Sequence, residues 1–248
     1  MKEWIVGRNP VYEVLRARRR HVFRLWVARN SEEKGRLAEL VRLGRERKLN
    51  PEYVPRQQLD ALDETHQGVA LEASAYPYST LADIIALAQE RQEPLFVLIL
   101  DVIQNPQNLG TLLRTAEIAG MHGVLIPLAH AAGITPAVVN ASAGACEHLL
   151  VAQANLSQSI AALKEAGAWV IGLEGESDAA PIEEARLDGP LALVVGSEGE
   201  GMRALTRKSC DLLVRLDMAG KIESYNAAVA GSIAIYLARQ ARIKEGRG

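Results

Sequence analysis

Short runs of apolar residues recur along the second part of the chain and predict buried parallel strands. The runs are apolar at nearly every position rather than at alternate ones, as in a sheet that helices cover on both faces. Helical patterns separate them, at about residues 108–120, 135–146, 156–167 and 226–243. The runs are Leu95–Asp101, Gly123–Pro127, Trp169–Leu173, Leu191–Gly196 and Leu212–Leu216. We therefore expect an α/β fold with a parallel sheet.

A shorter alternation of strand and helix patterns precedes this region. Val22–Val27 and Val69–Ala73 indicate strands, and Glu32–Lys48 indicates a helix between them. A proline-containing break then leads into a helical pattern that ends at about Glu90 and that Ser79 or Thr80 can cap. The expected organisation is a small N-terminal α/β domain (1–73), a linker with a connecting helix (74–93) and a C-terminal domain (94–248).

Composition indicates an ordinary globular protein. Apolar residues make up 48% of the 248 residues and charged residues 23%. No apolar run reaches the length of a membrane span, and the N-terminus lacks a signal peptide, so we expect a cytoplasmic protein without membrane contact. Two cysteines, Cys146 and Cys210, suit neither a disulfide framework nor a zinc site, and we expect no metal.

Charge is distributed unevenly along the chain. Residues 1–58 carry 15 Lys and Arg against 7 Asp and Glu, whereas the rest carries 13 against 23, for a net charge of −2. Such an asymmetry suggests that the N-terminal part meets a polyanion, although a solvated basic face remains equally open. The candidate RNA-binding residues are Arg16, Arg18, Arg19, Arg20 and Arg24.

Three loops that follow predicted strands carry the candidate chemistry, since ligands gather at the carboxyl ends of parallel strands. The first loop, Asp101–Gly110, contains Asn108 and runs into a helix that carries Arg114. The two are six positions apart, so they do not share one helix face. Taken alone, Asn108 is more simply a helix cap and Arg114 a surface charge.

The second loop, Gly196–Met202, contains three glycines that let backbone amides approach a ligand closely. Its glycine spacing is neither the dinucleotide fingerprint nor a P-loop, which argues against a nucleotide-dependent oxidoreductase. Its two carboxylates, Glu198 and Glu200, suit a cationic or hydroxyl-bearing ligand better than a phosphate. A simple tight turn is the alternative.

The third loop, Leu216–Asn226, opens an apolar helix. Ser224 and Asn226 are strong N-cap residues, so capping is the simplest interpretation of each. Helix N-termini also present free amides to ligands, which keeps a binding role open.

In this order and at this spacing, the loops resemble the motifs of the SpoU/TrmH family of RNA 2′-O-ribose methyltransferases, within the SPOUT superfamily. His66–Val69 is similar to the end of that family's N-terminal RNA-binding domain. The resemblance covers the whole chain. The matching segments are Asn108–Ala116 (NLGTLLRTA), Leu193–Met202 (LVVGSEGEGM), Leu216–Gly220 (LDMAG) and Ser224–Ala230 (SYNAAVA).

The resemblance implies a SPOUT domain with a trefoil knot, a homodimer packed about that knot, and an N-terminal RNA substrate-binding domain. It implies S-adenosyl-L-methionine as cofactor and methyl transfer to a ribose in structured RNA. The most similar members methylate a guanosine in 23S rRNA, while tRNA or another rRNA nucleotide remains open. A non-catalytic RNA-binding module is the rival class.

The resemblance also assigns site residues. The family gives Arg114 a part in activating the hydroxyl, but a guanidinium is a poor base, so we expect it to bind an RNA phosphate or stabilise the developing alkoxide, and to act as a base only under a strong perturbation. Asn108 would position Arg114 or the ribose, and Glu198 would orient Arg114 or a hydroxyl. Ser224 and Asn226 would shape the loop that meets substrate and cofactor. Two positions depart from the common family pattern, because Asp217 replaces a proline and Tyr225 a leucine. The catalytic candidates are Asn108, Arg114, Glu198, Ser224 and Asn226, and the cofactor-binding candidates are Gly196, Gly199, Leu216, Met218 and Tyr225.

Overall fold

The computed structural model describes residues 2–129, 131–175, 179–222 and 224–246, so Glu223 in the third loop lies outside the described residues. Contacts divide the chain into two units. The first consists of Met1–Pro77 with Ile134–His148, and the second of Tyr78–Gly133 with Leu149–Gly248. The segment Ile134–His148 thus packs with the N-terminal residues, although the sequence pattern places it in the C-terminal domain.

A four-stranded sheet forms the centre of the first unit, in the order β1-β4-β2-β3. Strand β4 pairs antiparallel with both β1 and β2, whereas β3 pairs parallel with β2. The predicted strands correspond to β2 and β4, and the sequence pattern missed β1 and β3. The strands are β1 (Lys2–Val6), β2 (Val22–Ala28), β3 (Glu52–Val54) and β4 (Val69–Ser74).

The longer helices of this unit, α1 (Arg8–Ala17) and α2 (Arg36–Glu46), pack against each other. Helix α2 is shorter than the predicted Glu32–Lys48, because Gly35 has a φ of 54° and the helix begins only after it. The predicted helix at 135–146 is also shorter, since Ala143 and Gly144 both have positive φ. The remaining helices are α3 (Arg56–Asp60), α6 (Pro136–Ala141) and the 3-10 turn η1 (Ala145–His148).

The second unit contains a seven-stranded sheet in the order β7-β6-β5-β10-β8-β11-β9, and every pair in it is parallel. This confirms the predicted α/β fold; the trefoil knot stays a prediction. Strands β5, β6 and β10 are buried at every position. The strands are β5 (Phe96–Leu100), β6 (Gly123–Pro127), β7 (Leu150–Ala154), β8 (Trp169–Leu173), β9 (Ala180–Pro181), β10 (Leu191–Val195) and β11 (Leu212–Arg215).

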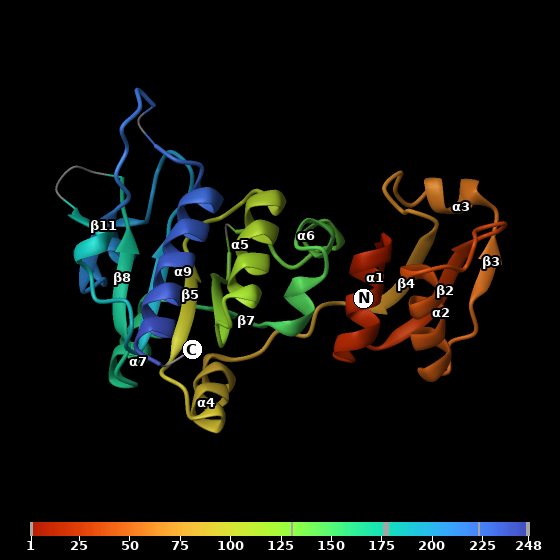
Figure 1. Ribbon diagram of the computed structural model, residues 1–248, viewed down its shortest axis with the longest axis horizontal. Helices are drawn as coiled ribbons and strands as arrows, with labels where there is room; N and C mark the ends of the chain where they lie inside the picture. The colour runs from red at the N-terminus through yellow and green to blue at the C-terminus, as the bar shows by residue number, and fades with distance from the viewer. Residues whose placement is uncertain (1, 130, 176–178, 223, 247–248) are drawn as a thin grey trace. The chain divides into compact units, whose positions relative to one another are not determined.

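Helices cover both faces of this sheet. Helices α4 (Leu81–Arg91) and α7 (Leu156–Glu165) share one apolar core with the sheet, and α8 (Ala204–Lys208) contacts α7. Helices α5 (Pro106–Ile118) and α9 (Ala227–Lys244) lie side by side (Figure 1).

Helix α9 approaches α5 and the sheet closely at Gly231. A Cβ atom at that position would lie 2.6 Å from the side chain of Leu112 and 3.1 Å from that of Val195. A hydrogen bond of 3.0 Å between the hydroxyls of Thr115 and Ser232 joins the two helices. The packing of α9 therefore holds its N-terminus next to the start of α5.

Two chemical features of the described residues bear on the class of protein. None of the described helices is both long enough and apolar enough to cross a membrane. Cys146 and Cys210 are free thiols, the first of them buried.

Candidate active site

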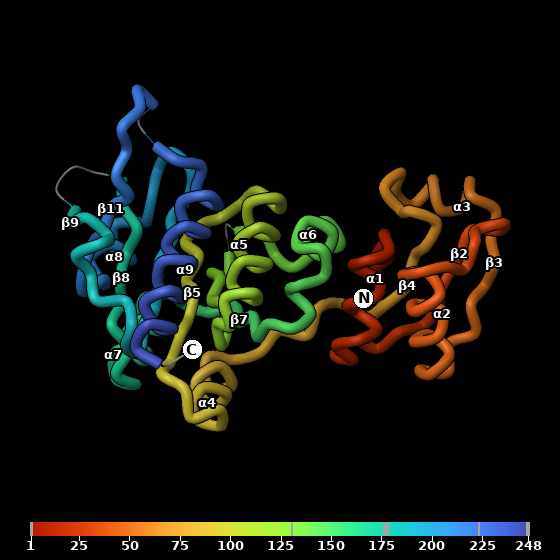
Figure 2. The backbone as a smooth tube through the Cα atoms, in the orientation of Figure 1, coloured from red at the N-terminus to blue at the C-terminus, as the bar shows by residue number. Residues whose placement is uncertain are grey.

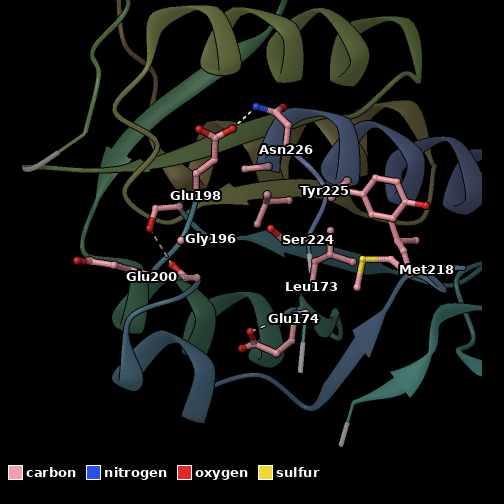
Figure 3. A pocket seen from close by; sticks show the side chains of 17 residues that line it. Leu173, Glu174, Gly196, Glu198, Glu200, Met218, Ser224, Tyr225 and Asn226 are labelled. Carbon is pink, nitrogen blue, oxygen red and sulfur yellow. Dashed lines mark hydrogen bonds between the residues drawn. The ribbon is translucent and has the colours of Figure 1, made fainter. Parts of the chain in front are cut away.

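A cavity of about 450 Å³ lies at the carboxyl ends of β8, β10 and β11, beside the N-terminus of α9 (Figure 3). Residues 216–222, which follow β11 and line the cavity at Leu216 and Met218, extend away from the sheet (Figure 2). The lining residues are Leu173, Glu174, Gly175, Val195, Gly196, Ser197, Glu198, Gly199, Glu200, Gly201, Leu216, Met218, Ser224, Tyr225, Asn226, Ala227 and Ala230.

All five cofactor-binding candidates and three of the five catalytic candidates line this one cavity. They come from separate loops, which the parallel sheet brings to one edge. Two lining residues that the sequence analysis missed, Leu173 and Glu174, follow from the same rule, because Leu173 ends strand β8 and Glu174 directly follows it. The Glu174 carboxylate forms an ion pair of 3.1 Å with Arg207.

The glycine loop forms a closed turn against the cavity. The backbone N–H groups of Ser197 and Gly201 donate to each other's carbonyl oxygens at 2.9 and 3.2 Å. A Cβ atom at Gly196 would lie 2.3 Å from the carbonyl carbon of Gly201, so this position excludes any side chain. At Gly199 the φ is 85°, and apart from its chain neighbours no described atom lies within 4 Å of a built Cβ, so the space that a side chain would fill is open to a ligand.

Asn226 joins the three loops. Its Oδ1 accepts hydrogen bonds from the backbone N–H of Ala228 and Val229 at 3.0 and 3.2 Å, which caps helix α9. Its Nδ2 donates to Oδ1 of Asn108 at 3.3 Å. The same nitrogen also donates to Oε1 of Glu198 (Figure 3). The capping interpretation of Asn226 thus holds together with a second contact that links the first and second loops.

Asn108 does not cap α5, because Asn105 does so by accepting from the N–H of Gln107 at 2.8 Å. Asn108 lies in the first turn of the helix, in contact with Asn226. Arg114 lies further along the same helix, with an exposed side chain, and does not line the cavity. Asn226 therefore joins Asn108 and Glu198, whereas Arg114 forms no hydrogen bond or ion pair with them among the described residues.

The two positions that depart from the family pattern contact each other. The Tyr225 hydroxyl donates to the Asp217 carbonyl oxygen at 3.3 Å, which links the two ends of the third loop. Tyr225 and Met218 lie together at one end of the cavity, away from Glu198 and Asn226 (Figure 3). Ser224 also lines the cavity and is exposed.

The charge of the cavity wall is negative. Glu174, Glu198 and Glu200 line it, and no Lys or Arg is among its described lining residues. Carboxylates near a cavity favour a positively charged ligand. Within the described part of the chain, no group of His, Cys, Asp and Glu has the arrangement of a metal site.

Arg20, which the sequence analysis proposes as an RNA-binding residue, is buried in the structure. Its side chain is 0% exposed and donates to both carboxylate oxygens of Glu147, at 3.1 and 2.8 Å, and to Glu3 at 3.0 Å. Burial alone would lower the pKa of Arg20, but the Glu147 carboxylate raises it. Arg20 is thus a structural residue of the first unit, and its guanidinium is not on the surface.

The other arginines of the cluster differ in their contacts. Arg19 donates to the Tyr76 hydroxyl and to the Pro77 carbonyl oxygen, both at 3.0 Å. Arg24 forms two hydrogen bonds with the Glu72 carboxylate and lies over the rings of Trp4 and Trp26. Two members of the cluster have exposed side chains at the end of α1, namely Arg16 and Arg18.

Comparison with known proteins identifies the family. Residues 95–236 match the SpoU rRNA Methylase family, and residues 4–79 match the family described as RNA 2′-O ribose methyltransferase substrate binding. The chain is 42% identical over 239 residues to the TrmH family tRNA/rRNA methyltransferase YacO of Bacillus subtilis, with 94% of each chain covered. It is 36% identical over 247 residues to the 23S rRNA (guanosine-2′-O-)-methyltransferase RlmB of Pseudomonas putida, with 98% of each covered.

Solved structures support the fold. The SpoU methyltransferase AviRb from Streptomyces viridochromogenes, in complex with AdoMet, matches 98% of this chain and 91% of its own, with a TM-score of 0.80 and 23% identity. The fold, the joined motifs and the two family matches agree. The chain belongs to the SpoU rRNA methylase family, and it is an RNA methyltransferase of that family.

Proposed function

We propose that this chain transfers the methyl group of S-adenosylmethionine to a ribose 2′-hydroxyl in a structured RNA. The observation that carries the proposal is the hydrogen-bonded group of Asn108, Glu198 and Asn226 beside the glycine-loop cavity. In an RNA methyltransferase family, a polar group of this kind at the edge of a cavity can orient a substrate hydroxyl. A non-catalytic RNA-binding module would not need it.

S-adenosylmethionine suits the chemistry of the cavity. Glu198 and Glu200 would attract its positive charges, while Leu216, Met218 and Tyr225 offer apolar surface for the adenosine part. The AdoMet complex of AviRb, a protein with the same fold, supports this choice. When bound, the cofactor supplies an electrophilic methyl group on a sulfonium sulfur.

The chain's own residues then have to align the ribose hydroxyl and manage its proton. Alignment is worth several kcal/mol of barrier. A guanidinium is a donor rather than a base, so Arg114 would bind an RNA phosphate or stabilise the developing alkoxide. Asn108 and Glu198 would orient the ribose or Arg114, and Ser224 with Asn226 would shape the loop that meets both ligands.

A homodimer is part of the proposal. Helices α5 and α9 pack together, and large apolar side chains on them are exposed: Ile118 by 72%, Tyr236 by 60% and Ile243 by 48%. Exposed apolar surface that gathers in one patch is typical of protein–protein contacts, and these side chains lie on two helices that pack against each other. Arg114 is exposed on the same helix as Ile118, so a dimer built on these helices would bring Arg114 to the subunit interface.

Light scattering tests the dimer. Tyr236→Glu would place a charge in the interface and is expected to yield a monomer, whereas the control Leu205→Glu, on the short helix α8, should stay dimeric. Leu205 is similarly exposed, at 63%, which makes the two substitutions comparable. A wild-type monomer, or a dimer that survives Tyr236→Glu, would contradict this part of the proposal.

A guanosine in 23S rRNA is the favoured target, supported by the similarity to RlmB along the whole chain. Exposed arginines at the end of α1, Arg16 and Arg18, are the members of the basic cluster that we propose as RNA contacts. The experiment is a map of 2′-O-methylated riboses in rRNA and tRNA from cells with and without the gene. If a 2′-O-methyl group were missing from tRNA alone in cells without the gene, the substrate would be a tRNA and not 23S rRNA.

A further inference from the structure

A second cavity, of about 380 Å³, lies wholly within the first unit. It forms where α1 and α3 begin, where β2 ends and where the chain turns into β4. No carboxylate is among its described lining residues, although several other arginines of the first unit form ion pairs with carboxylates. The lining residues are Arg8, Ala28, Ser31, Arg56, Gln67 and Gly68.

Arg8 is held in place at the edge of this cavity. Its backbone N–H donates to Oε1 of Gln67 at 3.1 Å, and its Nε–H donates to the carbonyl oxygen of Gln67, also at 3.1 Å. Within the described residues, neither terminal nitrogen of its guanidinium has a hydrogen-bond or ion-pair partner. These nitrogens form the planar fork that matches two oxygens of a phosphate.

A buried histidine fixes the turn that holds Arg8. Gln67 and Gly68 have φ values of 49° and 84°. The Gly68 N–H donates to Nδ1 of His66 at 2.7 Å, so the ring carries its proton on Nε2 and donates it to Asp60 at 2.8 Å. His66 is 0% exposed. The turn is therefore formed before any ligand arrives, which lowers the entropy cost of binding.

Arg56 supplies a second cation at the same cavity. Its side chain is 74% exposed, and its nearest carboxylate, Asp60, lies 3.8 Å from its Nε, beyond hydrogen-bond distance. An exposed ion pair of this length contributes little free energy, so a phosphate can compete for the guanidinium. The Ser31 side chain adds a hydroxyl that can donate to a phosphate oxygen.

We propose that this cavity binds a backbone phosphate of the RNA substrate, with Arg8 and Arg56 as its two cationic ligands. The inference rests on the proposed function, which supplies RNA as the substrate. In the predicted basic cluster, Arg20 and Arg24 form short ion pairs with the protein's own carboxylates, at 2.8 and 2.9 Å. Arg8 and Arg56 line one cavity, and the carboxylate of Asp60 lies 3.8 Å from Arg56 and is not among the described lining residues. RNA therefore also crosses the end of the unit where α1 and α3 begin.

Filter binding to transcribed 23S rRNA over a series of KCl concentrations tests the site. Each phosphate contact contributes about 0.7 to 0.9 to the slope of log affinity against log salt. Replacing both residues, as Arg8→Ala with Arg56→Ala, should reduce the slope by roughly 1.4 to 1.8 and weaken binding on the order of ten-fold at moderate salt. S-adenosylmethionine affinity should not change.

Two matched variants make the result specific. Arg42→Ala with Arg45→Ala removes the same charge from exposed positions on α2 and should leave the slope unchanged. Arg8→Lys with Arg56→Lys keeps the charge but loses the fork, and should retain the slope with reduced affinity. The alanine pair removes the hydrogen bond from the Arg8 side chain to Gln67 and could disturb folding. The lysine pair keeps a long cationic side chain at both positions, so it tests the site in a protein that is less disturbed.

The inference would be overturned if the folded alanine pair kept the wild-type slope and affinity, or if the α2 pair reduced them equally. In either case wild-type protein that still binds and methylates the RNA leaves the proposed function standing. Wild-type protein that neither binds nor methylates RNA would overturn the proposed function and this site with it.

Discussion

The side-chain amide of Asn226 lies 3.3 Å from Oδ1 of Asn108, a residue 118 positions earlier in the chain. The same nitrogen donates to Glu198, and the amide oxygen caps helix α9. The Asn226 side chain therefore ends the third loop and also fixes the position of the first loop relative to the second. Because its oxygen and its nitrogen have separate partners, substitution can test the two roles separately.

Asn226→Asp should separate capping from positioning. Aspartate keeps an oxygen that can cap the helix, but it loses the N–H donors and places a second carboxylate beside Glu198. We expect the melting temperature to stay near that of the wild type while methyl transfer falls on the order of 100-fold. Asn226→Ala, as the comparison, should also lose about 0.5–2 kcal/mol of stability. A fully active Asn226→Asp would show that the bridge does not position the site.

Arg114→Ala should abolish methyl transfer and leave S-adenosylmethionine affinity within a few-fold of the wild type. Transfer should be lost because Arg114 is the proposed contact to the RNA phosphate or the developing alkoxide. Cofactor affinity should be kept because Arg114 is exposed on α5 and does not line the cavity. Arg114→Lys keeps the charge without the planar fork, so it should be strongly impaired if two-point contact matters. Single-turnover assays and calorimetry measure the two effects, and near wild-type turnover by the alanine variant would make the catalytic assignment wrong.

Gly199→Val should prevent cofactor binding, because a β-branched side chain would occupy the space that a ligand needs next to the glycine loop. The change also strains the backbone, since φ is 85° at this position. Gly167→Val is a matched control: Gly167 has the same φ of 85° and open surroundings, but it lies outside the cavity. Calorimetry should show lost affinity for the first variant and unchanged affinity for the second. Equal affinities would place the cofactor elsewhere.

Arg20→Ala should destabilise the protein strongly, because it leaves the buried carboxylate of Glu147 without its partner. Breaking one side of a buried ion pair costs about 3–5 kcal/mol. Arg18→Ala, two residues earlier and exposed, should change stability by less than about 0.5 kcal/mol. Urea unfolding measures both. Similar midpoints for the two variants would contradict the structural role of Arg20.

The contrast between these arginines shows what the sequence could predict. The charge count correctly finds a basic N-terminal region, but it cannot tell a surface arginine from a buried one. The ion-pair partner of buried Arg20 is Glu147, which lies 127 residues later in the chain. The sequence pattern assigns the segment that contains Glu147 to the C-terminal domain, whereas it packs with the first unit. Such a contact depends on tertiary packing, which periodicity does not contain.

The parallel sheet was easier to predict, because buried strands such as Leu191–Val195 are apolar throughout. Strand β7 was missed although it is also largely apolar, since its five residues include Gln153. The rule that ligands bind at the carboxyl ends of parallel strands predicts, from the sequence alone, that the motif loops lie next to one another. Applied to every strand, it would also have found Glu174 after β8.

Methyl transfer by the intact protein is the decisive test of the proposed activity. Wild-type protein, tritiated S-adenosylmethionine and 23S rRNA from cells that lack the gene are incubated together, and the labelled nucleotide is then mapped. If the proposed function holds, we expect label on the 2′-oxygen of one ribose, and no label with Arg114→Ala. Label on a base, or no transfer to any RNA from those cells, would contradict it.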